Sequence, residues 1–192
     1  ESLFTNVPLK ETIELAIDLI MKCPRNKLSR SQLSKLFTFA TTMTHFLFNG
    51  CIYDQVDGVA MGSPLGPTLA NLFMGHYENM WLDEFSACKV VMYRRYVDDI
   101  FCVFESKEDA ELFYNFINQK HPKIKFTCER ETEGRLAYLD VLVENLGSAV
   151  STKSYHKSTF TGLYTNFLSF TPFSYKLGLI RCLLYRAFQI NN

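Results

Sequence analysis

Residues 90–104 read VVMYRRYVDDIFCVF, in which two adjacent carboxylates, Asp98 and Asp99, stand between two apolar runs that favour β-strands. The pattern predicts a tight hairpin with acid at its tip. Mg²⁺ takes hard oxygen ligands and usually keeps substrate phosphates in its shell, so paired Asp residues at a rigid tip suit divalent metal binding. Two such ions, about 3.5–4 Å apart, would clamp an in-line phosphoryl displacement.

The simpler interpretation of this segment is an ordinary turn, because Asp is a common turn residue. Val97-Asp98 is nevertheless poor turn chemistry, since tight hairpins favour Asn-Gly or Asp-Gly. A poor turn between two strong strands indicates a strained position, which is typical of functional sites.

Residues 58–67 read GVAMGSPLGP and precede a helical pattern that runs from Thr68 to about Phe85. Ser63 is expected to cap this helix, with Pro64 or Pro67 in its first turn. Glycines before a helix N-terminus leave backbone N–H groups exposed and let another chain's backbone approach closely. No Gly-Lys-Ser/Thr follows, so this is not a phosphate-binding P-loop. Taken alone, the segment is more simply an ordinary loop that leads into a core helix.

The remaining patterns predict an α+β fold with a mainly antiparallel sheet packed on helices. A hairpin over residues 46–53 is expected around a type I′ turn at Asn49-Gly50. Helices are expected over residues 9–21, from 29 or 31 to about 45, from 106 or 107 to about 119, and from Pro172 onward. Strands are expected over residues 124–128, 136–143 and 150–156, with a turn at Glu133-Gly134.

Composition sets only loose limits on function. The 192 residues suit one domain or one and a half, and the net charge of zero counts against general nucleic-acid binding. Local basic patches, Arg94-Arg95 and Lys120/Lys123/Lys125, are candidates for phosphate contact or plain solvated faces. The cysteines form no Cys-x-x-Cys pair, which favours reduced thiols in an intracellular protein. No apolar run approaches the length of a membrane span.

Taken together, several segments resemble one enzyme family. A Gly-x-x-x-Gly-Ser-Pro-x-x-Pro loop followed by Tyr-x-Asp-Asp resembles motifs B and C of reverse transcriptases, and the opening Ser2–Pro8 resembles the tail of motif A. The amino-acid sequence of these motifs is most similar to that of the Penelope-like retroelements. Five segments, in the same order, carry this resemblance: Leu3–Pro8, Gly58–Pro64, Tyr93–Asp99, Leu136–Val141 and Thr159–Tyr164.

The resemblance implies a reverse-transcriptase-like palm over residues 1–147, with partial fingers, and a palm-to-thumb connection with a helical thumb start over residues 148–192. It implies an RNA-directed DNA polymerase, a nucleotidyltransferase that adds dNTPs to a DNA primer on an RNA template. It also implies flanking domains of a retrotransposon polyprotein, no membrane association, and an intracellular, nuclear location. In that family the first catalytic Asp precedes the Leu-Phe-Thr-Asn segment. We therefore expect it just upstream of Glu1, and expect residues 1–192 alone to be inactive.

The same resemblance implies roles for individual residues. Asp98 and Asp99 would be catalytic and would bind two Mg²⁺ or Mn²⁺ ions. Phe4 matches a bulky gate that clashes with a ribose 2′-hydroxyl, although a core Phe is the plainer interpretation. Tyr96 would pack beside the acidic tip, or be a core aromatic.

The loop residues Met61, Gly62, Ser63 and Pro64 match positions that line the nucleotide and template, with Met61 where many reverse transcriptases carry Gln. Lys125, or Lys123, is a candidate proton donor to pyrophosphate. Two other functions stay open: an inactive palm-like nucleic-acid-binding remnant, and an RNA-dependent RNA polymerase, which the Gly-Ser-Pro sequence disfavours.

Overall fold

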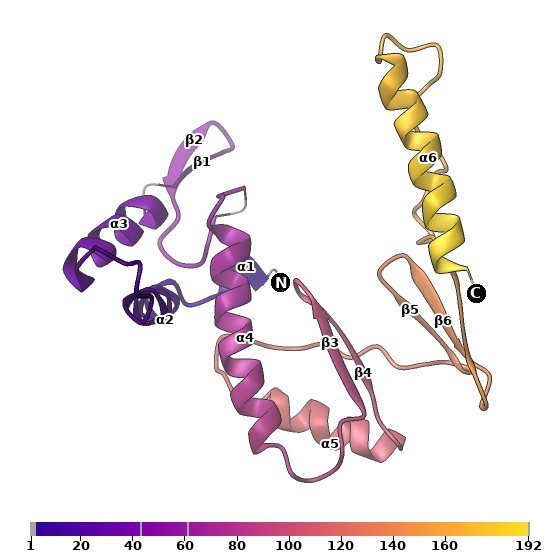
Figure 1. The fold of residues 1–192 in the computed structure, drawn as a ribbon, viewed down its shortest axis with the longest axis horizontal. Coiled ribbons are helices and arrows are strands. Elements are labelled where there is room, and N and C mark those ends of the chain that lie inside the picture. Colours follow the sequence, from indigo (N-terminus) through magenta and orange to yellow (C-terminus); the bar gives the residue numbers. More distant parts are fainter. Residues whose placement is uncertain (1–2, 43, 61, 192) are drawn as a thin grey trace. The chain divides into compact units, whose positions relative to one another are not determined.

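The computed structural model describes residues 3–42, 44–60 and 62–191, which form two compact units, Glu1–Thr127 and Cys128–Asn192 (Figure 1). The first unit has helices α1 to α5 and two separate hairpins, β1–β2 and β3–β4. Its elements are α1 Leu3–Asn6, α2 Leu9–Met21, α3 Arg30–Thr42, β1 His45–Phe48, β2 Cys51–Asp54, α4 Gly66–Glu84, β3 Met92–Tyr96, β4 Asp99–Val103 and α5 Lys107–Ile117.

Two hydrophobic clusters hold the first unit together, and α4 contributes to both. The apolar stripe of α2 packs on α4, so that Ile17 and Phe73 are fully buried. Further along α4, Trp81 packs with Phe113 of α5 and with residues of the β3–β4 hairpin. Helix α4 therefore packs against both the N-terminal helices and the β3–β4 hairpin, and so sets the position of the hairpin relative to those helices.

Local sequence signals explain where several elements begin. Ser106 caps α5, because its hydroxyl accepts a hydrogen bond from the Asp109 N–H at 3.1 Å. Ser29 and Gln32 form a reciprocal capping box ahead of α3. In the β1–β2 hairpin Asn49 and Gly50 have φ of 48° and 77°, which confirms the predicted type I′ turn.

Three sequence predictions in this unit are wrong. Helix α3 ends at Thr42 rather than near His45, which instead begins β1. Ser63 does not cap α4: the cap position is Leu65, without a side-chain cap, while Pro67 does lie in the first turn. Residues 124–128 form no strand, because the Phe126 N–H and C=O bond to the side chain of Asn118 instead of a neighbouring strand.

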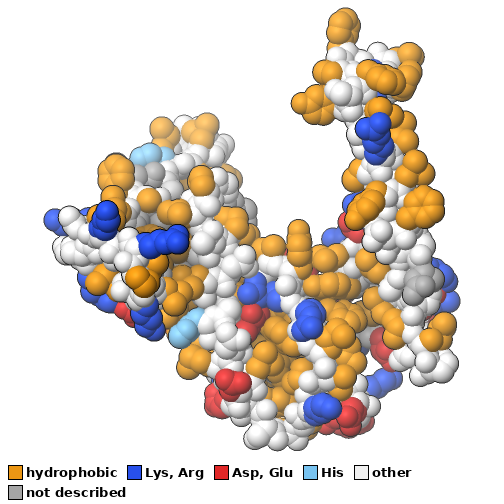
Figure 2. All heavy atoms as spheres, viewed as in Figure 1, with side chains coloured by type: hydrophobic (Ala, Val, Ile, Leu, Met, Phe, Trp, Pro, Cys, Tyr) orange, Lys and Arg blue, Asp and Glu red, His pale blue; other side chains and the backbone are white. Residues whose placement is uncertain are grey.

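The second unit contains a three-stranded antiparallel sheet in the order β5–β6–β7 and the long helix α6. Its elements are β5 Arg135–Tyr138, β6 Val141–Asn145, β7 Val150–Ser154 and α6 Phe173–Ile190. The last turn of α6 meets β7, since the Ser154 N–H donates to the Asn191 side chain at 3.0 Å. Hydrophobic side chains are exposed along α6, as Figure 2 shows.

The predicted single strand over residues 136–143 is wrong, because a turn at Leu139-Asp140 divides it into β5 and β6. Leu139 has φ of 55°, and the Asp140 side chain is ion-paired with Arg186 of α6. The predicted Glu133-Gly134 turn is confirmed by the bridge between Thr132 and Arg135.

The α+β class with antiparallel strands is confirmed, although the strands in the described part of the chain form three small sheets rather than one. The predicted functional boundary after residue 147 stays a prediction; Gly147 lies between β6 and β7, inside the second unit. None of the helices that the structure describes has the length and apolar character needed to span a bilayer.

Candidate active site

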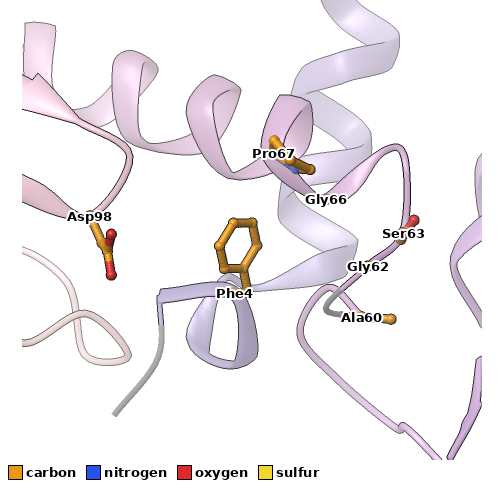
Figure 3. Close-up of a pocket in the computed structure, with 7 residues that line it drawn as sticks. All are labelled: Phe4, Ala60, Gly62, Ser63, Gly66, Pro67 and Asp98. Carbon is orange, nitrogen blue, oxygen red and sulfur yellow. The ribbon is translucent and has the colours of Figure 1, made fainter. Parts of the chain in front are cut away.

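A pocket of about 440 Å³ brings together three segments of the first unit that are far apart in sequence (Figure 3). They are the start of α1, the loop that leads into α4, and the β3–β4 turn. In Figure 3 the Phe4 ring stands between the Asp98 carboxylate and the loop residues. The lining residues are Phe4, Ala60, Gly62, Ser63, Gly66, Pro67 and Asp98. Four residues predicted from sequence, Phe4, Gly62, Ser63 and Asp98, therefore meet at one pocket.

A close backbone approach fixes the Phe4 side of this pocket. The Val59 N–H donates to the Phe4 carbonyl at 2.7 Å. One residue earlier, Gly58 has φ of 77°, and a Cβ on it would lie 2.5 Å from the Thr5 carbonyl oxygen. Only glycine fits this position. The predicted approach of another chain's backbone to these glycines stays a prediction; at Gly58 the backbone that approaches is the chain's own α1.

Asp57 strengthens the same junction, and the sequence patterns did not predict it. Its Oδ1 accepts hydrogen bonds from the N–H groups of Gly58 at 2.9 Å and Leu9 at 3.3 Å, and its Oδ2 pairs with Lys123 Nζ. The hydrogen bond from Lys123 is the largest cause of a lowered pKa of the Asp57 carboxyl, with the two backbone bonds acting in the same direction. An Asp followed by Gly ahead of a motif is too common a pattern to have identified this role.

The acidic tip is the two-residue turn Val97-Asp98, closed by the pairing of Tyr96 with Asp99. Val97 has φ of 56°, a rare conformation for a β-branched residue, so the predicted strain in the backbone is confirmed. Asp98 lines the pocket, whereas Asp99 begins β4, and both are exposed. Tyr96 lies beside the tip and is 63% exposed, so the alternative of a core aromatic is wrong.

The Arg95 side chain is largely covered and bonds to α4, rather than forming part of a basic patch. Its Nε donates to Glu78 Oε1 at 2.6 Å, and its Nη1 donates to Asn71 Oδ1 at 2.8 Å and to the Val97 carbonyl at 2.9 Å. The Tyr93 hydroxyl donates to the same Glu78 oxygen at 2.5 Å. Burial, and then this bond to Glu78, raise the pKa of Tyr93. Arg94, on the opposite face of β3, is exposed.

Of the remaining predicted residues, those that the structure describes are not among the residues that line the pocket. Lys125 Nζ donates to the Asn118 carbonyl at the end of α5, and Lys123 is paired with Asp57. Pro64 belongs to the loop but does not line the pocket, and Met61 lies outside the described residues. The roles predicted for these residues stay predictions.

The carboxylates at the tip suit a hard cation that keeps part of its shell for substrate. Among the residues that the structure describes, no group of three or more His, Cys, Asp or Glu side chains could hold a metal ion. Asp98 and Asp99 offer two neighbouring carboxylates, and Mg²⁺ is typically held by one or two carboxylates plus phosphates and water. The donor set therefore fits Mg²⁺ or Mn²⁺ bound together with a nucleotide.

A family model described as "Reverse transcriptase (RNA-dependent DNA polymerase)" matches residues 1–131. This range includes every residue that lines the pocket and the whole β3–β4 hairpin. A comparison with curated proteins found no match to this chain.

Proposed function

Because the chain belongs to the reverse transcriptase family, we propose that it forms the palm, and the start of the thumb, of a Penelope-like retroelement polymerase that copies RNA into DNA. The family supports nucleotidyl transfer and nucleic-acid and dNTP substrates in general. The Penelope-like assignment rests on the five sequence segments named above. For an element of that kind, we place the site of action in the nucleus.

The single observation that carries the proposal is the convergence of Asp98 and Phe4 on one pocket with the first turn of α4. Asp98, with Asp99 beside it, would bind the divalent ions. Bound Mg²⁺ or Mn²⁺ would supply activation of the primer 3′-hydroxyl and neutralise charge on the transferring phosphate.

The residues of this chain would supply position and selectivity. Phe4, held by the Val59 N–H, presents its ring to the pocket and would pack against the sugar of the incoming nucleotide. A ribose 2′-hydroxyl would meet this ring, so a deoxynucleotide is favoured. Ser63 and Gly62 form the opposite wall, where the base pair with the template would lie.

The test is primer extension by the full-length protein on a primed RNA template with dNTPs and Mg²⁺. Asp98→Ala should abolish incorporation, because a metal ligand is lost at the reacting atoms. The matched control is Asp18→Ala, which removes an exposed carboxylate on α2 that is paired with Arg30. Incorporation that survives Asp98→Ala would refute the proposal. A folded wild-type protein that binds primed template without extending it would favour the inactive remnant instead.

A further inference from the structure

One face of helix α4 contributes both to the pocket and to the contacts of Arg95. Pro67 lines the pocket, and Asn71 and Glu78 both bond to Arg95. At 100° per residue, positions 67, 71 and 78 fall within about 40° of one another around the helix. The same rigid element therefore forms one wall of the pocket and holds the side chain of Arg95.

Arg95 connects this helix face to the acidic tip. Its side chain is 12% exposed and that of Glu78 is 9% exposed, so the ion pair between them is largely removed from water. The same Nη1 that bonds to Asn71 also donates to the Val97 carbonyl. The Val97 carbonyl belongs to the peptide group that joins Val97 to Asp98. Because a peptide group is planar and rigid, holding its oxygen restrains the Cα of Asp98.

The tip needs such a restraint. Val97 has φ of 56°, which a β-branched side chain disfavours, and conformations of this kind persist only where surrounding contacts impose them. A two-residue turn that relaxed would carry the Asp98 carboxylate away from the pocket wall formed by α4.

We propose that Arg95 is a positioning residue, which holds Asp98 at the pocket by tying the Val97 carbonyl to Glu78 and Asn71 of α4. This inference rests on the proposed polymerase function. A direct phosphate contact does not fit Arg95, because its Nε and Nη1 donors are already engaged and its guanidinium is shielded from solvent.

Three variants separate positioning from a general contribution to folding. Arg95→Met alone leaves the buried Glu78 carboxylate without its cation, and is expected to lower Tm strongly. Arg95→Met combined with Glu78→Gln removes both charges and keeps a side-chain oxygen that can accept from the Tyr93 hydroxyl, so it should recover most of that loss. The Val97 carbonyl remains unheld in both. Arg95→Lys keeps a cation beside Glu78, but a single ammonium cannot reproduce the bonds to Glu78, Asn71 and Val97 together.

The first measurement is Mn²⁺ binding to the full-length protein by electron paramagnetic resonance, at a temperature well below the Tm of the least stable variant. The second is primer extension, with kcat and the KM for dNTP obtained separately. Both the double variant and Arg95→Lys should weaken Mn²⁺ binding about tenfold, since losing a residue that orients a metal ligand typically costs 10–100-fold. The kcat should fall by a similar factor, with a smaller change in KM. The same Met and Lys substitutions at Arg30, an exposed residue that pairs with Glu14 and Asp18, should change neither quantity.

The outcomes distinguish this inference from the proposed function. The wild-type protein should bind Mn²⁺, and Asp98→Asn should abolish that binding. If either result is not observed, the proposed function has failed. If that binding exists, and both Arg95→Lys and the double variant bind Mn²⁺ as wild type does, the positioning role alone is overturned. Recovery of metal affinity in step with Tm in the double variant would also overturn it, because Arg95 would then act only on stability.

Discussion

Replacing Gly58 by Ala would place a methyl carbon 2.5 Å from the carbonyl oxygen of Thr5 and 2.8 Å from its carbonyl carbon and Cα. Ordinary contacts of a Cβ begin near 3.4 Å, so the segment before α4 and helix α1 would have to separate by about 1 Å. The neighbouring bond from the Val59 N–H to the Phe4 carbonyl, now 2.7 Å, would then stretch beyond the normal range.

The expected cost has two parts. Holding Ala at a φ of 77° costs about 1–2 kcal/mol, as for other L-residues in the left-handed region. Forcing a methyl group against backbone that cannot rotate away adds about 1–3 kcal/mol, the usual range for overpacking. We therefore expect Gly58→Ala to lower the free energy of unfolding by about 2–5 kcal/mol, which is a large share of the stability of an ordinary domain.

Urea denaturation followed by circular dichroism measures this loss, and two other glycines serve as controls. Gly62 has φ of 89°, and a Cβ added there would meet nothing within 4 Å, so Gly62→Ala should show the backbone cost alone. Gly75 lies inside α4 with open space around it, so Gly75→Ala should stabilise by about 0.5–1 kcal/mol. A Gly58→Ala protein that is no less stable than Gly62→Ala would show that the close approach between α1 and this segment is absent.

Two further predictions concern the same pocket wall. Phe4→Ala should raise the use of ribonucleotides relative to deoxynucleotides about tenfold or more in primer extension by the full-length protein, since the ring no longer excludes the 2′-hydroxyl; equal use of both by wild type would contradict the gate. Asp57→Asn should lower Tm at neutral pH but not in acid. The folded-state pKa of Asp57 is lowered, chiefly by Lys123, so its contribution exists above the unfolded pKa of about 4 and is lost as pH falls through the folded-state value. Melting curves from pH 7 down to pH 2.5 should therefore converge for the two proteins, and a gap that persists at the acid end would contradict this account.

Elements fixed by contacts close in sequence could be predicted from the sequence. The apolar spacing of Leu9–Met21, the Asn49-Gly50 turn and the helix predicted to open at Ser106 or Lys107 each depend on residues within one or two turns of chain, and all three are confirmed. Residues 124–128 show the limit of that approach. Their side chains suit a strand, but Ile124 is buried against the α2–α4 cluster and the Phe126 backbone bonds to Asn118. Packing with distant residues, rather than β-propensity, decides their conformation.

The candidate site divides in the same way. The sequence predicts the acidic tip and the loop before α4, because the residues that give each its chemistry are adjacent in the chain. The convergence of Phe4 with both of them depends on Gly58, whose importance is visible only once α1 lies against it.

The sequence does indicate the role of Arg95, although the adjacent Arg94 makes the two residues look equivalent. Arg94 and Arg95 look alike as neighbours, but a strand alternates its faces, so Arg95 shares a face with Tyr93 and Arg94 does not. On the helical pattern of α4, Glu78 falls among the buried positions, where a lone carboxylate is costly unless it is paired. A buried acid on a helix and an inward-facing arginine on the next strand each require a partner, and here they meet through the 2.6 Å bond between Arg95 and Glu78. A charged residue at a position that the helix or strand period assigns to the core therefore predicts a contact with an opposite charge on another element. In this chain that contact supports the turn that carries Asp98.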